Sequence, residues 1–332
     1  VVPDLAGSGA RVVVVPDLGG PLESLDPVLE ALARGGVASL IAPLLRATEH
    51  EPGNPDGFYA LGMAFKKAGR YADAIRAFDS AKELAPHDLD TWATLADVLF
   101  EVREFQAARD ILDRGLAACG DHPALLEKAL ATAKMLSDTE GAIGYVEREL
   151  ELVPHHEQGW HNLANLSLLT NDFDKSEQAA RELLKRNPKS WEAWFHLGNL
   201  FDAVPLEEKA EEAYRKAVEL APDNWKVLTN LAGLLIQMES SAKNAEAVPL
   251  LERALMRSPE GDWRVHYNLA LAYTKLGKRE HALEVARWIL REAPEDDAMA
   301  QEARRLESNL LGGAHRPGAP ADRARSARPE HP

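Results

Sequence analysis

The chain has 332 residues, of which 45% are hydrophobic and 27% are charged, and its formal net charge is −15. These proportions are ordinary for a folded protein and argue against wholesale disorder. A helix that crosses a bilayer needs about 20 consecutive apolar residues. The sequence has no such run, so we expect no membrane insertion. The acidic balance, without long basic patches in residues 21–311, argues against nucleic acid as a partner.

Cys119 is the single cysteine, which excludes an internal disulfide and a cysteine-based zinc site. It leaves the compartment open, with the cytoplasm as the first expectation and the bacterial periplasm as the alternative. Because the sequence starts at Val1, we expect either a removed leader or a piece of a longer chain.

Residues 1–20 form an N-terminal extension of a different character. The β-branched run at Arg11–Val15 predicts a strand. A lone strand is not stable in water. We therefore expect it to pair with a missing upstream domain, a second copy of the chain or another protein.

From residue 52 onward the prolines are regularly spaced. Pro52 and Pro86 are 34 residues apart, as are Pro154 and Pro188, and Pro188 and Pro222. Gly120 takes the place between Pro86 and Pro154. Six residues after these positions come large apolar residues, namely Phe58, Trp92, Leu126, Trp160, Trp194 and Leu228. Twelve residues before the next turn come small residues, namely Ala74, Ala108, Ala142, Ser176, Ala210, Ala247 and Ala282.

These columns predict consecutive pairs of helices. Large residues three and four apart give each helix one apolar face. Small residues at fixed places let two helix backbones approach closely, and a proline ends the second helix. Gly69 and Gly277 lie between the two helices of a pair, where a left-handed residue ends the first one.

The segment Asn54–His87 closely resembles the tetratricopeptide-repeat consensus, and the resemblance extends over residues 54–296 in seven units. It implies an all-α, right-handed superhelical solenoid of about eight helix–turn–helix units. It also implies that a protein or peptide ligand lies on the inner surface, which the first helices line. The matching residues are Phe58, Leu61, Gly62, Phe65, Gly69, Tyr71, Ala74, Phe78, Ala81 and Pro86.

The segments around these units follow the same spacing less closely. Residues 21–53 predict a degenerate first repeat, and residues 297–311 predict a capping helix, which a repeat array needs at its end. About three extra residues near Glu239–Asn244 are expected to lengthen one turn. Residues 312–332 are rich in Gly, Pro, Ala and Arg, which predicts a disordered tail.

Sequence motifs for catalysis are absent. The chain has no P-loop, no Gly-x-Ser-x-Gly elbow and no His-Glu-x-x-His. We therefore expect no enzyme, no catalytic or metal-binding residue and no cofactor. His161 and His196 fall on neighbouring first helices, and we interpret them as solvated imidazoles, with a shared metal or a pH-sensitive contact as the alternative.

Asparagine recurs at inward-facing positions of the later repeats. Asn162, Asn230 and Asn268 share one column, and Asn165 and Asn199 share another. An amide carries donors and an acceptor, so it can pair with both polar groups of a peptide unit. The alternative is that asparagine is simply a frequent soluble residue there. Asp202 and Gln237 are also expected to face the inner surface. The predicted partner-binding residues are His161, Asn162, Asn165, Phe195, His196, Asn199, Lys226, Asn230, Tyr267 and Asn268.

The family's clamp for chaperone tails is a poor match to this chain. When three consecutive repeats are aligned with the clamp, its positions are occupied by His161 and Asn165, then His196, then Lys226 and Asn230. Histidine replaces the lysine and the asparagine that the clamp requires at its first two places. We therefore do not expect a clamp for a C-terminal carboxylate.

The expected function is a scaffold or adaptor that binds an extended peptide or a partner protein. One alternative is the substrate-recruiting arm of a larger enzyme whose catalytic domain is absent from this chain. Another is a self-assembling scaffold, in which Arg11–Val15 or the first repeat docks on another copy.

Overall fold

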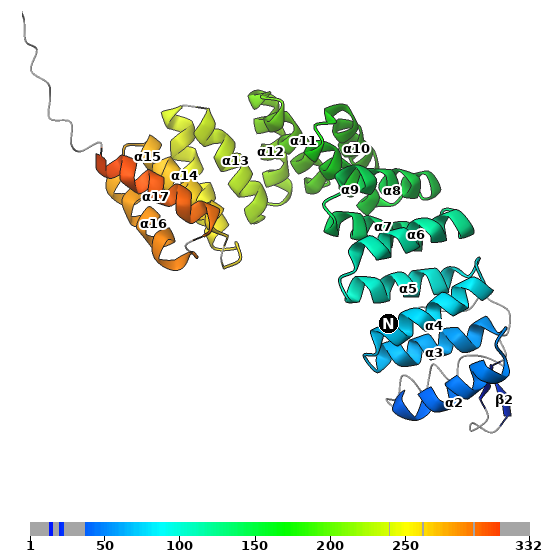
Figure 1. Ribbon diagram of the computed structural model, residues 1–332. Coiled ribbons are helices and arrows are strands. Elements are labelled where there is room, and N and C mark those ends of the chain that lie inside the picture. Colours follow the sequence, from blue (N-terminus) through cyan, green and yellow to red (C-terminus); the bar gives the residue numbers. More distant parts are fainter. Residues whose placement is uncertain are drawn as a thin grey trace, which may run out of the picture. The chain divides into compact units, whose positions relative to one another are not determined.

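The computed structural model describes residues 13–15, 20–22, 37–238, 240–260, 262–294 and 296–312. In these ranges the chain forms sixteen helices and one short pair of strands (Figure 1). The predicted tail lies outside the described residues, apart from Gly312. The helices are α2 Val37–His50, α3 Pro55–Lys67, α4 Tyr71–Leu84, α5 Leu89–Glu101, α6 Phe105–Cys119, α7 Pro123–Met135, α8 Thr139–Leu152, α9 Glu157–Leu169, α10 Phe173–Arg186, α11 Trp191–Ala203, α12 Glu207–Leu220, α13 Trp225–Gln237, α14 Ser241–Leu255, α15 Trp263–Lys275, α16 Arg279–Glu292 and α17 Ala298–Gly312.

The two strands pair with each other. β1 (Val13–Val15) lies within the predicted strand, and it is antiparallel to β2 (Gly20–Leu22), with Val13 opposite Leu22. The expectation of an external pairing partner is therefore wrong, because a segment of the same chain supplies the second strand.

The chain divides into two compact units, Val1–Ala179 and Ala180–Pro332, with the boundary inside α10. In the first unit α3 packs on α4, α5 on α6 and α7 on α8, and each second helix also contacts the first helix of the next pair. In the second unit α11 packs on α12, α13 on α14 and α15 on α16. Each unit is thus a stack of helix pairs, and the first unit also contains the β1–β2 pair.

The columns of small residues mark where paired helices touch. A Cβ atom on Gly62 would lie 2.7 Å from the Phe78 ring, and one on Gly198 would lie 2.4 Å from the Tyr214 ring. Both distances are shorter than carbon contacts allow, so these two glycines permit the aromatic rings to pack against the backbone. The alanines of the second column are fully buried, namely Ala74, Ala108, Ala142, Ala210, Ala247 and Ala282.

The six-residue spacing between turn proline and tryptophan has a structural reason. The indole nitrogen of Trp92 donates a hydrogen bond of 2.8 Å to the carbonyl oxygen of Pro86. Trp160 makes the same contact with Pro154 at 2.9 Å. The indole thereby satisfies a backbone carbonyl group in the turn before its own helix.

Six of the turns within the described helix pairs contain a residue with positive φ. Gly69 and Gly277 adopt φ values of 74° and 70°, as their positions predict. Arg103 and Asn171 adopt 66° and 58° at the equivalent place in other pairs. Asparagine tolerates this left-handed conformation better than arginine does, because its short side chain bonds locally.

The extra residues of the sixth full unit do not lie where the sequence predicted. Three residues, 238–240, separate α13 from α14, as three separate α3 from α4. The added length is instead in α14, which has 15 residues, and in the turn at 256–262 that follows it. This longer turn precedes α15 and sets the register of the last helix pair.

The helix at the C-terminal end of the described chain covers the last pair. α17 packs against α15 and α16 and buries Ala300, Ala303 and Leu306. The Arg287 side chain of α16 donates to the Glu307 carboxylate of α17 at 2.7 Å. α17 thus covers apolar surface that the final pair would otherwise expose.

Candidate functional site

The first helices of the second unit form a groove. α11, α13 and α15 line a pocket of about 260 Å³. Its wall combines a carboxylate, four polar side chains, aliphatic side chains and one glycine. We call this set the inner groove, and its residues are Asp202, Thr229, Asn230, Gly233, Leu234, Ile236, Gln237, Asn268 and Leu271.

Asn230 is held by a neighbouring asparagine. Its side-chain nitrogen donates a hydrogen bond of 2.8 Å to the side-chain oxygen of Asn199 on α11. The hydroxyl of Tyr214 on α12 donates to the same oxygen, also at 2.8 Å. Burial, with the charge of Asp202 in second place, raises the pKa of Tyr214, so this hydroxyl stays protonated. Asn199 therefore positions Asn230, and no donor to the Asn230 side-chain oxygen is found among the described residues.

Asn268 is a partly exposed amide of the inner groove. Among the described residues its side chain has no hydrogen-bond partner. A Cβ atom on Gly233 would lie 3.6 Å from the Asn268 side-chain nitrogen, so the missing side chain at 233 leaves the amide uncovered. Asn268 can therefore offer both a donor and an acceptor to a ligand.

Asp202 supplies the negative charge of the inner groove. The side chain comes from the last turn of α11 and is partly buried. Burial, together with the charge of Glu207, raises the pKa of the Asp202 carboxyl above its usual range. In the described part of the chain no Lys, Arg or His lies within 4.0 Å of this carboxylate.

Five predicted partner-binding residues of the second unit do not line the inner groove: Asn199, described above, and the four that follow. Phe195 is half-buried among aromatic rings, and Tyr267 packs beside the apolar cluster of α15, α16 and α17. Lys226 is exposed at the start of α13. His196 is only 7% exposed, so the interpretation of its imidazole as solvated is wrong.

In the first unit the predicted residues lie on α9. The Lys134 ammonium donates a hydrogen bond of 2.8 Å to the Asn162 side-chain oxygen, and burial lowers the pKa of this lysine. His161 is partly buried, with its Nε2 3.8 Å from the Glu157 carboxylate. Asn165 is exposed. The acceptor of Asn162 is thus already used within the chain, whereas Asn165 faces solvent.

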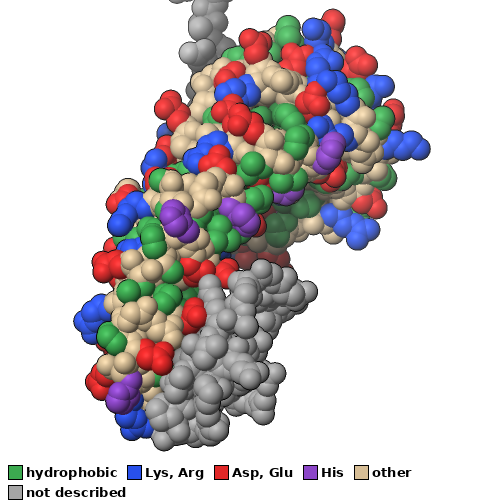
Figure 2. Space-filling view, turned by 90° about the vertical axis from the view of Figure 1, so that its right-hand side faces the viewer, with side chains coloured by type: hydrophobic (Ala, Val, Ile, Leu, Met, Phe, Trp, Pro, Cys, Tyr) green, Lys and Arg blue, Asp and Glu red, His purple; other side chains and the backbone are tan. Residues whose placement is uncertain are grey.

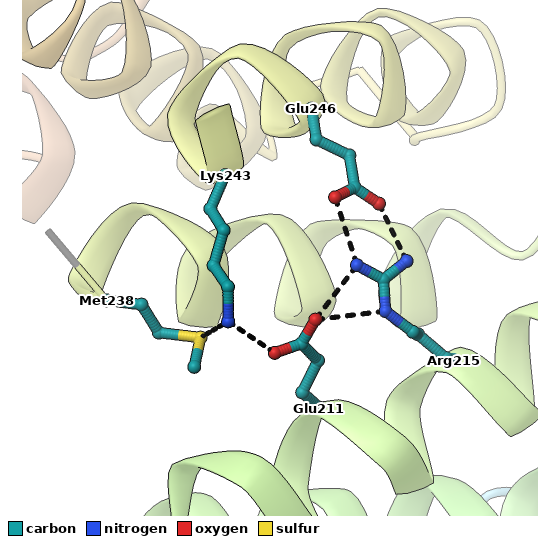
Figure 3. Close-up of polar contacts among 5 residues, drawn as sticks. All are labelled: Glu211, Arg215, Met238, Lys243 and Glu246. Carbon is teal, nitrogen blue, oxygen red and sulfur yellow. Dashed lines mark hydrogen bonds and ion pairs between the residues drawn. The ribbon is translucent and has the colours of Figure 1, made fainter. Parts of the chain in front are cut away.

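Charged side chains join the second helices of the second unit (Figure 3). The Arg215 guanidinium on α12 contacts both carboxylate oxygens of Glu246 on α14, at 2.6 and 3.0 Å, and also contacts Glu211. The Lys243 ammonium donates to Glu211 at 2.6 Å and lies 3.0 Å from the sulfur of Met238. This network ties α12 to α14 and to the end of α13, which carries much of the inner groove.

On the face shown in Figure 2, acidic and basic side chains are interspersed. None of the described helices is long and apolar enough to cross a membrane. In the described ranges no group of three or more His, Cys, Asp or Glu side chains is arranged to hold a metal ion.

Sequence reasoning missed the apolar floor of the inner groove. It singled out Asn230 and Gln237, but not Gly233 or Leu234 between them. Gly233 and Leu234 lie three and four residues after Asn230, and four and three residues before Gln237, which is the spacing of one helix face. This spacing in the sequence could have predicted that Gly233 and Leu234 share the face of Asn230 and Gln237.

Stacked helix–turn–helix pairs with a groove on their first helices define a helical-repeat scaffold. The model of the cytochrome c-type biogenesis protein H TPR domain matches residues 162–300, and two tetratricopeptide-repeat models match residues 65–132 and 29–88. The chain belongs to the tetratricopeptide-repeat family. Proteins of this family are typically non-enzymatic scaffolds for protein interactions.

Solved structures share the fold at low sequence identity. A tetratricopeptide repeat protein from Parabacteroides merdae matches with a TM-score of 0.56 and 16% identity, over 77% of this chain and 98% of that one. Yeast Tom70 matches with 0.53 and 16%, over 88% and 60%. PilF of Pseudomonas aeruginosa matches with 0.51 and 13%, over 65% and 96%. No curated protein matches the sequence significantly.

Proposed function

We propose that this chain binds an extended segment of another polypeptide in the inner groove. The observation that carries the proposal is the open amide of Asn268, which faces the same pocket as Asn230. Each amide can bond to a peptide unit whatever its side chain. A single such bond contributes about 1 kcal/mol, so the partly exposed aliphatic side chain of Leu271 must add to the affinity.

Asn165 on α9 belongs to the first unit, where its amide is exposed on a first helix. Asn162 and Asn199 take a different role. Their oxygens accept hydrogen bonds from Lys134 and from Tyr214 and Asn230, so they shape the surface.

The hypothesis of self-assembly through the N-terminal strand loses its original motivation. That hypothesis rested on an unpaired strand, and β1 pairs with β2 of the same chain. Binding of a separate polypeptide remains the function that the groove supports best.

The test is a peptide-display selection against the purified full chain, followed by affinity measurement on the variants. Asn268→Ala should weaken binding about fivefold to tenfold, the equivalent of one hydrogen bond. Gly233→Leu should weaken it more, because the new side chain occupies the groove beside Asn268. The matched control is Asn309→Ala, an exposed asparagine of α17. Equal affinity of all three variants would exclude the inner groove as the binding site.

A second candidate function comes from the family models. The model of the cytochrome c-type biogenesis protein H TPR domain covers residues 162–300, which include the whole inner groove. We therefore propose that this polypeptide binding takes part in cytochrome c-type biogenesis. A strain without the gene should then contain less c-type cytochrome, and the wild-type gene should restore the level while the Gly233→Leu gene should not. A normal level in the deletion strain would contradict this candidate.

A further inference from the structure

The carboxylate of Asp202 is partly buried, and among the described residues it has neither an ion pair nor a hydrogen bond. Glu211, for comparison, contacts both Arg215 and Lys243. Asp202 has no Lys, Arg or His within 4.0 Å among the described residues, and its charged neighbour is the carboxylate of Glu207. A partly buried charge without a counter-ion is costly. The negative charge of the inner groove therefore has no counter-ion among the described residues.

The rest of the groove suits a long side chain with an apolar stem. The partly exposed Leu271 provides aliphatic contact, while Asn230 and Asn268 provide polar groups near the charge. The volume of about 260 Å³ is below the roughly 300–1,000 Å³ of small-molecule sites. It has room for one side chain of a longer bound segment. Lysine and arginine combine such an apolar stem with a cationic head.

We propose that the inner groove binds a Lys or Arg side chain of the partner polypeptide, with its cationic head at the Asp202 carboxylate and its stem on Leu271. This inference rests on the proposed function and adds the class of residue that is recognised. The amides of Asn230 and Asn268 hold the backbone or the head of the same ligand.

The test is a positional-scanning hexapeptide library bound to the purified full chain. The wild type should select Lys or Arg at one position. Asp202→Asn keeps the shape of the side chain and removes its charge, so it should lower the affinity for the selected peptides about 10- to 100-fold, the range of a charged hydrogen bond. Glu212→Gln, which neutralises an exposed carboxylate of α12, should leave the affinity unchanged.

Charge reversal gives a second, independent readout. Asp202→Lys should replace the preference for Lys or Arg by a preference for Asp or Glu at the same position. Two further peptides identify the source of the cation. One has an acetylated N-terminus, and the other has norleucine in place of the selected basic residue. Binding that survives acetylation and is lost with norleucine supports the proposal.

The outcomes that would overturn the inference differ from those that would overturn the proposed function. If the wild type selects peptides without a basic residue, or if Asp202→Asn binds the selected peptides as tightly as the wild type does, the recognition of Lys or Arg is wrong and peptide binding stands. If binding is lost on acetylation alone, the cation is a terminal amine, and the side-chain assignment is wrong. If no peptide binds, the proposed function fails with it.

Discussion

The side chain of Asn230 donates a hydrogen bond of 2.8 Å to the side-chain oxygen of Asn199, which joins α13 to α11. Asp97 and Lys128 form an ion pair at the same two helix positions in the first unit, between α5 and α7. The ninth residue of one first helix thus contacts the sixth residue of the next in both units. These two positions link neighbouring repeats, through an ion pair in the first unit and through a hydrogen bond between two amides in the second.

Replacing Asn199 by alanine should destabilise the protein. The Tyr214 hydroxyl is buried and would lose its acceptor, and the amide of Asn230 would lose the same oxygen. An unsatisfied buried polar group costs about 1–3 kcal/mol, which urea unfolding measures directly. Asn268→Ala is the matched control, because that side chain has no partner among the described residues. It should change the unfolding free energy by less than about 0.5 kcal/mol. Equal effects of the two variants would contradict this assignment of roles.

Two glycines of the second unit should respond to alanine in opposite directions. Gly198→Ala would place a Cβ atom 2.4 Å from the Tyr214 ring, which is only 1% exposed and cannot easily move. Overpacking of this kind costs about 1–3 kcal/mol. Gly233→Ala meets only the Asn268 side chain, at 3.6 Å, and should add up to about 1 kcal/mol through helix propensity. Thermal unfolding of the two variants checks both signs. A loss of stability in Gly233→Ala would show that this part of α13 is tighter than the structure indicates.

Asp202→Asn should stabilise the unliganded protein at neutral pH. The folded state raises the pKa of the Asp202 carboxyl, so between the ordinary value and the raised one the folded protein binds more protons than the unfolded chain. The contribution of Asp202 to the free energy of unfolding therefore falls as the pH rises between these two pKa values. At higher pH this contribution stays at its lower level. The asparagine variant cannot ionise and avoids this loss. Its stability advantage should disappear as the pH drops below the ordinary range of aspartate. Melting temperatures across this pH range measure the effect, and an advantage that does not depend on pH would contradict it.

The network of Glu211, Arg215 and Glu246 should contribute a salt-dependent stabilisation. The Arg215 and Glu246 side chains are each 41% exposed, so solvent screens their attraction. Arg215→Ala should therefore lower the unfolding free energy by about 1 kcal/mol or less at low salt. At about 1 M salt, where the Debye length is about 3 Å, the difference should shrink. Arg279→Ala, which changes an exposed arginine at the start of α16, serves as the control. An undiminished difference at high salt would show that Arg215 acts through packing.

The sequence predicted the helix pairs well because their spacing is a property of local chain geometry. Gly69 and Gly277 take the left-handed conformation that their positions require. The extra length of the sixth full unit was placed in the wrong turn. It lies at 256–262, after α14, because the three-residue turn at 238–240 is kept. The repeat spacing in the sequence shows how many residues are added. The packing of the helices decides in which segment they lie.

The sequence by itself determined the family, the helical pairs and the column in which asparagine recurs. Only the tertiary structure decided what each asparagine does. Asn230 contacts Asn199, Asn162 contacts Lys134, and Asn268 remains open in the inner groove, although all three occupy the sixth place of a first helix. A hydrogen bond needs two atoms within about 3 Å. That distance depends on how neighbouring helices pack and on which side chains face each other, and a repeat period encodes neither.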